Sequence, residues 1–193
     1  MTRAQGTTAI CLVSAFLLLP LLAEHAHGQG ESAEKRPMAE KLYSAGYLMT
    51  LMGHYEEAIR LLRRSLEIEP TAEAYTFLGW TYSHLGDYPR AIEEAEKAVR
   101  IDPDFGNPYN DIGVYLIELG REDEAIPYLE KAMRAKRYCC YQFPHFNLGR
   151  IYLKKGMYER ARREFRRSLA IDPDYAPARR ALELLEELPR KEL

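Results

Sequence analysis

The chain has 193 residues and a formal net charge of −2, with 29% charged and 47% hydrophobic residues. The charge argues against a strongly basic nucleic-acid-binding protein and against an acidic, disordered one. The length and composition are typical of a soluble globular or solenoid protein that buries a core within one domain.

The first 28 residues are typical of a secretory signal peptide. An uninterrupted apolar run over 9–23 is shorter than the ~20 residues that span a bilayer. Ala26 and Gly28 then stand at −3 and −1 of a cleavage site before Gln29. We therefore predict a signal peptide over 1–28 and a periplasmic or secreted mature chain. The alternative is an uncleaved anchor, which would tether the rest of the chain to the membrane outside the cytoplasm.

A pattern of about 34 residues recurs four times along the mature chain. The copies span 39–71, 72–105, 106–141 and 142–175, and the third is two residues longer than the second. The recurring positions are Gly46, Gly79, Gly113 and Gly149, then Gly53, Gly86, Gly120 and Gly156, then Ala58, Ala91, Ala125 and Ala161, with Pro70, Pro103 and Pro173 closing three copies.

Each recurring residue has a physical role in a pair of helices. The first Gly and the later Ala are small where two antiparallel helices touch. The second Gly suits a left-handed helix end, and Pro follows a helix that it cannot continue. Apolar residues between these markers, such as Leu78, Tyr82 and Leu85, keep helical spacing. The pattern therefore predicts an all-α protein of four helix–turn–helix units.

These positions resemble the tetratricopeptide repeat family, and the resemblance covers 39–175. It implies a right-handed α-solenoid in which the first helix of each repeat lines a concave groove. We expect 29–38 to be a flexible lead-in and 176–193 to form a capping helix and tail, because solenoids need a closed end. Leu182 and Leu185 are the predicted capping contacts.

The resemblance also implies a binding function without catalytic machinery, since this family binds extended peptides or partner helices in its groove. Carried over by position, the candidate groove residues are Tyr43, Tyr47, Phe77, Trp80, Asn110, Asp111, Val114, Phe146, Asn147 and Arg150. The aromatics are candidate anchors, and the two asparagines are candidate hydrogen-bonding groups for an extended backbone. The alternative is that curvature buries some of these aromatics between repeats. The carboxylate clamp of chaperone-binding members is absent, which disfavours chaperone tails.

The outer face offers a second candidate surface. The second helix of repeat four carries Arg160, Arg162, Arg163, Arg166 and Arg167. One interpretation is a solvated face held by pairs such as Glu159 with Arg163 at i,i+4. The other is a basic patch that contacts anionic lipid headgroups or an acidic partner.

The stretch 135–146 contains the only cysteines after the N-terminal segment. Cys139 and Cys140 fall at the two-residue insertion, and adjacent cysteines close a disulfide only in a strained ring. We expect His145 on a packing face, away from the thiols, and two thiols with one histidine fall short of a four-ligand zinc site. Phe146 is the expected functional residue of this stretch.

No phosphate loop, HExxH or CxxC signature is present, so we expect no enzyme activity, no cofactor and no metal. The sequence thus predicts a non-catalytic protein- or peptide-binding scaffold of the cell envelope, with a role in assembling an envelope complex as its specific form. The alternatives are a self-associating structural subunit and a thiol-dependent redox or metal role at the adjacent cysteines.

Overall fold

The computed structural model describes residues 35–187, and every regular element within them is an α-helix. The expected signal peptide over 1–28 lies outside the described residues. The first helix runs over 35–51. The others are α2 (Tyr55–Ile68), α3 (Ala72–His84), α4 (Tyr88–Ile101), α5 (Gly106–Glu118), α6 (Glu122–Arg134), α7 (Gln142–Lys154), α8 (Tyr158–Ile171) and α9 (Ala176–Glu187).

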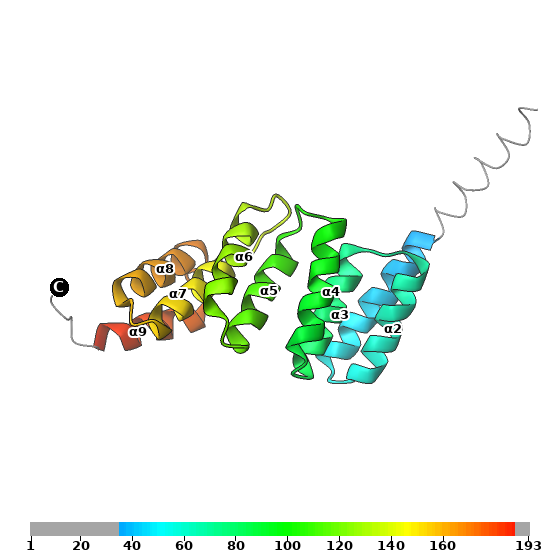
Figure 1. Cartoon of the computed structure of the whole chain (residues 1–193), viewed down its shortest axis with the longest axis horizontal. Helices are drawn as coiled ribbons and strands as arrows, with labels where there is room; N and C mark the ends of the chain where they lie inside the picture. Colours follow the sequence, from blue (N-terminus) through cyan, green and yellow to red (C-terminus); the bar gives the residue numbers. More distant parts are fainter. Residues whose placement is uncertain (1–34, 188–193) are drawn as a thin grey trace, which may run out of the picture.

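The helices follow one another along an elongated solenoid, from the blue end of the chain to the red end (Figure 1). Within a repeat the two helices pack together, as α3 does with α4, α5 with α6 and α7 with α8. The first helices of neighbouring repeats also meet, α3 with α5 and α5 with α7, so they form one continuous face. We call the face made by helix 35–51, α3, α5 and α7 the first-helix face. The predicted all-α solenoid is confirmed.

The turn inside each repeat is closed by a glycine in the left-handed region. In repeat two Gly86 has φ +75°, and the next residue, Asp87, donates its N–H to the carbonyl oxygen of Tyr82 at 3.0 Å. This six-to-one bond closes the end of α3 at the carbonyl oxygen of Tyr82, which also accepts the N–H of Leu85 at 3.0 Å. The same arrangement occurs at the other three turns, at Gly53, Gly120 and Gly156.

Close approach of paired helices explains the earlier glycine of each repeat. A Cβ at Gly79 would lie 2.8 Å from the carbonyl oxygen of Ala91, and one at Gly149 would lie 2.4 Å from Cε1 of Phe165. Ala91 and its equivalents in the other repeats are fully buried. The sequence interpretation of small residues at helix contacts is therefore confirmed. The neighbour is backbone at Gly79, whereas it is a side chain at Gly149.

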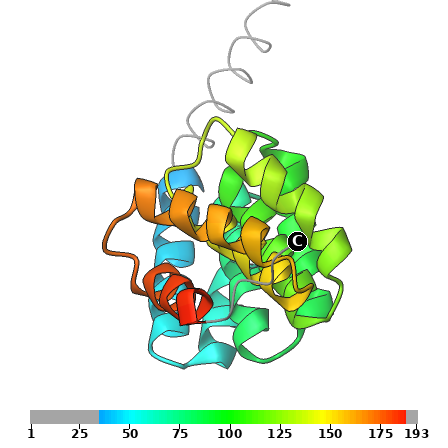
Figure 2. The same cartoon turned by 90° about the vertical axis from the view of Figure 1, so that its left-hand side faces the viewer.

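The C-terminal helix closes the last repeat. Leu185 of α9 is 1% exposed and packs with Phe165 of α8, and Leu182 lies against the same cluster. Arg162 of α8 donates to the carbonyl oxygen of Leu185. Figure 2 shows α9, in red, at the near end of the solenoid, below the orange α8.

The start of the first helix differs from the sequence expectation, and the structure locates the insertion of repeat three more exactly. Residues 35–38, assigned to the lead-in over 29–38, are already helical, and Pro37 is tolerated because it lies in the first turn. The inserted segment is the connection over 135–141 between α6 and α7, whereas 102–105 suffices between α4 and α5. We call 135–141 the inserted loop.

Candidate functional site

Partly exposed aromatic side chains line the first-helix face of repeats one and two. Tyr47, from helix 35–51, lies with its ring centroid 4.8 Å from that of Phe77 and 5.6 Å from that of Trp80, both on α3. Tyr43 also lies against Phe77, at 5.8 Å. These rings remain accessible, and Tyr47 is 36% exposed. They form one surface that can receive an apolar side chain.

The aromatic surface extends beyond the predicted residues toward the turn of repeat one. The edge of His84 meets the Trp80 ring at 4.6 Å, and Tyr55 of α2 stacks on His84 at 5.6 Å. We define Tyr43, Tyr47, Tyr55, Phe77, Trp80 and His84 as the aromatic strip. Sequence reasoning missed Tyr55 because it lies on a second helix, where the repeat pattern assigns no groove residue.

Polar side chains replace the aromatics on the same face of repeats three and four. Asn147 of α7 donates to the Oδ1 atom of Asn110 of α5 at 3.3 Å, and both side chains are nearly buried, at 5% and 8% exposed. Arg150 donates to Asn147 and to Glu118, the latter at 2.8 Å. The predicted asparagines thus bind each other across two repeats, and this chain of hydrogen bonds fixes their orientation.

Asp111 and Val114, both on α5, are partly buried on this face. Burial raises the pKa of the Asp111 carboxyl to about 7, although a hydrogen bond from Asn110 acts in the opposite direction. Asp111 therefore exchanges its proton near neutral pH. Burial is the main cause that raises the pKa of the Tyr115 and Tyr138 phenols. The nearby Asp111 carboxylate raises both pKa values further.

Phe146 lies at the edge of the face, where it joins the packing of the C-terminal end. Its ring is 5.7 Å from that of Phe165 on α8 and 5.3 Å from that of Tyr175, which precedes α9. The side chain is partly exposed. A substitution at Phe146 would disturb these packing contacts as well as the surface. A test of binding is therefore better made by substituting Tyr47 and Trp80 together.

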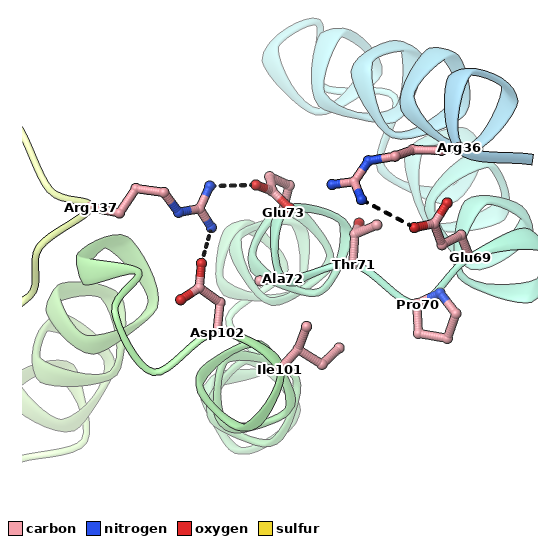
Figure 3. A pocket seen from close by; sticks show the side chains of 9 residues that line it. All are labelled: Arg36, Glu69, Pro70, Thr71, Ala72, Glu73, Ile101, Asp102 and Arg137. Atoms are coloured by element: carbon pink, nitrogen blue, oxygen red, sulfur yellow. Dashed lines mark hydrogen bonds and ion pairs between the residues drawn. The ribbon is translucent and has the colours of Figure 1, made fainter. Parts of the chain in front are cut away.

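A cavity of about 260 Å³ opens where repeats one, two and three meet, at the start of α3. Figure 3 shows Arg137 and Arg36 reaching it from opposite sides. Arg137 pairs with Glu73 at 2.6 Å and with Asp102 at 2.7 Å, and Arg36 pairs with Glu69 at 3.5 Å. Because each of these charged groups already has a partner of opposite sign, the cavity is best explained as a junction between repeats.

Arg137 is the residue of this junction that the sequence did not single out. Its guanidinium also lies over the ring of Phe105, 4.0 Å from the centroid. The backbone of the inserted loop adds two bonds, from Arg137 N–H to the carbonyl oxygen of Asp104 at 2.8 Å and from Gly106 N–H to that of Arg137 at 3.1 Å. We call Arg137 and its partners Glu73 and Asp102 the loop clamp.

The adjacent cysteines, Cys139 and Cys140, follow Arg137 in the sequence of the inserted loop. Cys139 is exposed and Cys140 partly buried, both are free thiols, and their sulfur atoms are 2.9 Å apart. His145 points to another helix, where its Nδ1 atom lies 2.7 Å from a carboxylate oxygen of Glu164. Among residues 35–187, no group of three or more His, Cys, Asp or Glu side chains is arranged to hold a metal ion.

Several arginines of the outer face form internal contacts. Arg162 is buried and pairs with Glu159, so the pair expected between Glu159 and Arg163 is replaced by an i,i+3 pair. Arg167 pairs with Glu164 at 2.6 Å, and Arg160 lies over the Tyr152 ring at 5.7 Å. These contacts favour the interpretation of a solvated, internally paired face.

The fold and its first-helix face define an α-solenoid built from helix–turn–helix repeats. Sequence models described as tetratricopeptide repeats match residues 37–104, 107–139 and 143–175. The chain therefore belongs to the tetratricopeptide repeat family. No relative among curated protein sequences matches it.

Solved structures share this fold. MamA is 25% identical with a TM-score of 0.62, over 74% of this chain and 82% of that chain. PilF of Pseudomonas aeruginosa is 24% identical with a TM-score of 0.69, over 82% of this chain and 80% of its own. PilW, described as a type IV pilus biogenesis factor, is 24% identical with a TM-score of 0.70, over 77% of this chain and 70% of its own. At this identity PilF and PilW show the fold alone. Of the helices in the described part of the chain, none is long and apolar enough to cross a membrane.

Proposed function

We propose that this chain is a non-catalytic scaffold of the cell envelope that holds a partner protein segment against its first-helix face. The observation that carries the proposal is the aromatic strip, which stays accessible although its rings are packed against one another. Aromatic side chains of this kind supply large contact areas and dominate protein interfaces.

The two halves of the first-helix face suit different chemical groups of the bound segment. The strip in repeats one and two suits apolar or aromatic side chains of the segment, whose transfer from water supplies the affinity. The polar half, around Asn110, Asn147 and Arg150, suits backbone groups or a charged side chain. Because the Asn147–Asn110 bond holds these amides in place, the receptor loses little conformational entropy when the segment binds.

The envelope location rests on the sequence of residues 1–28, which precedes the described solenoid. It predicts export and cleavage before Gln29. Sequencing the N-terminus of the protein isolated from its native cells tests this directly. A protein found in the cytoplasmic fraction with Met1 in place would contradict the location while leaving the binding face untouched.

Site-specific photo-crosslinking in native cells tests the binding face. A photoreactive residue at His84, which is exposed on the aromatic strip, is expected to trap the partner. The matched control is the same residue at Arg64, exposed on α2. Tyr47→Ser combined with Trp80→Ser is expected to abolish trapping at His84 while the helical circular dichroism is retained. The same partners trapped equally from both positions would overturn the assignment of the face.

A further inference from the structure

Helix 35–51 and the first residue of the turn after it expose apolar side chains on the side opposite Tyr43 and Tyr47, which face repeat two. Leu48 is 54% exposed, Met38 53% and Met52 64%, and Ala45 lies between them on the same side of the helix. We call Met38, Ala45, Leu48 and Met52 the N-terminal end face. A contiguous apolar surface of this kind marks an interaction site when nothing covers it.

The repeat pattern shows what covers the same positions elsewhere in this chain. The equivalents of Leu48 are Thr81, Tyr115 and Ile151, which are 0%, 3% and 1% exposed. The equivalents of Ala45 are Leu78, Ile112 and Leu148, and all three are buried. Repeat one alone leaves these positions open.

In repeats three and four, the covering element is the second helix of the preceding repeat. Tyr115 packs in one cluster with Ala91, and its ring lies 6.2 Å from that of Tyr88, both on α4. Ile151 packs in one cluster with Ala125 and Leu129 of α6. The cover is thus an amphipathic helix that places alanine and larger apolar residues at i, i+3 and i+4 spacing.

Charge at the N-terminal end face adds one requirement. Lys41 is exposed at the position where repeats two, three and four carry buried Ala74, Pro108 and Pro144. A cover that buries this side of the helix would desolvate the Lys41 ammonium unless a carboxylate meets it. The cover that fits is therefore an amphipathic helix with an acidic residue beside its apolar face.

We propose that the N-terminal end face is a second protein-binding site, which takes an acidic amphipathic α-helix of a partner protein in the position that the second helix of a preceding repeat would occupy. This site is separate from the first-helix face and does not depend on the function proposed for it. Binding would extend the solenoid by one helix and bury its open end.

A stapled helical peptide with the sequence of residues 87–102 is the probe, because α4 covers the equivalent positions of α5 within the chain. It carries more acidic than basic residues. Fluorescence anisotropy with the full chain is expected to give saturable binding. Leu48→Asp is expected to weaken binding at least tenfold, and Lys41→Glu several-fold. Leu184→Asp, at an exposed apolar residue of α9, is the control and is expected to change nothing.

Three results would overturn the proposal. The first is equal binding of the probe by the native chain and by Leu48→Asp. The second is self-association of the native chain that Leu48→Asp removes, since the occupant would then be a second copy. The third is absence of probe binding by the native chain, which would also be found if its own apolar run over 9–23 occupied the face.

Discussion

Tyr138 packs directly on Gly106: a Cβ atom at Gly106 would lie only 2.4 Å from the Cβ of Tyr138. Gly106 opens α5 and Tyr138 belongs to the inserted loop, so the contact joins the start of repeat three to its exit. The ring of Tyr138 is nearly buried and meets Tyr141 edge-on at 5.3 Å. This contact holds the inserted loop on the solenoid.

Gly106→Ala is expected to lower the free energy of unfolding by about 1 to 3 kcal/mol, because the added methyl group overlaps Tyr138. Urea unfolding followed by circular dichroism measures the loss. Asn107→Ala is the matched control, since Asn107 is exposed in the same helical turn. In a Tyr138→Ala background the cost of Gly106→Ala should largely disappear. An undiminished cost there would contradict the contact as its cause.

Arg137→Ala is expected to destabilise the chain by roughly 1 kcal/mol. The substitution removes two ion pairs and the contact with Phe105, but the Arg137 side chain is 48% exposed and solvent screens its charge. A double-mutant cycle with Glu73→Ala should show coupling between the two residues. Arg134→Ala provides a control, because Arg134 makes one exposed pair at 3.7 Å. Strict additivity in the Arg137–Glu73 cycle would argue against the loop clamp.

Asp111→Asn is expected to stabilise the chain above neutral pH and to flatten its pH dependence. Burial raises the pKa of Asp111 to about 7, so the native state holds this proton at pH values where the unfolded chain has released it. The contribution of Asp111 is therefore fully present below about pH 4 and is lost as the pH rises through 7. At pH 8 the variant should gain on the order of 1 to 2 kcal/mol.

Urea unfolding at several pH values from 4 to 8 tests the Asp111 prediction. Asp174→Asn is the control, because the Asp174 side chain is 99% exposed. A stability difference between Asp111→Asn and the native chain that stays constant from pH 5 to pH 8 would show that the carboxyl is not titrating there.

The adjacent cysteines are expected to react at different rates. Burial raises the pKa of the Cys140 thiol to about 11, and the neighbouring Cys139 acts in the same direction. Since the thiolate is the reactive form, Cys139, which is also exposed, should be alkylated first. Peptide mass spectrometry after timed exposure to iodoacetamide at pH 8 gives the order. Faster labelling of Cys140 would contradict the prediction. The variant Cys139→Ser allows the alkylation rate of Cys140 to be measured by itself.

The repeat pattern predicted the turns, the tight helix contacts and the capping helix because each depends on local chemistry. A glycine at a left-handed helix end has the same reason to be present in every copy, as at Gly86. Leu185 could be placed as a cap because any solenoid must bury its last apolar surface. The helical start at 35 was missed, since a helix within a polar lead-in has no apolar period to reveal it.

The candidate site was predicted less fully, because its geometry depends on contacts between repeats. The aromatic positions followed from the family pattern, but the stacking of Tyr55 on His84 joins residues on different helices. Asn110 and Asn147 were predicted to hydrogen-bond the backbone of a ligand, whereas in the structure their side chains hydrogen-bond each other. Arg137 was not singled out, since its partners Asp102 and Glu73 lie about one and two repeats away in sequence.

The loop clamp has a consequence for how the solenoid comes apart. Repeat proteins gain stability mainly between neighbours, so unfolding begins at the ends and advances by repeats. Arg137 fastens the exit of repeat three to the beginning and end of repeat two, which adds a tie across the joint that α4 and α5 already form. Repeats two and three should therefore lose amide protection as one cooperative unit, with the outer repeats opening before them.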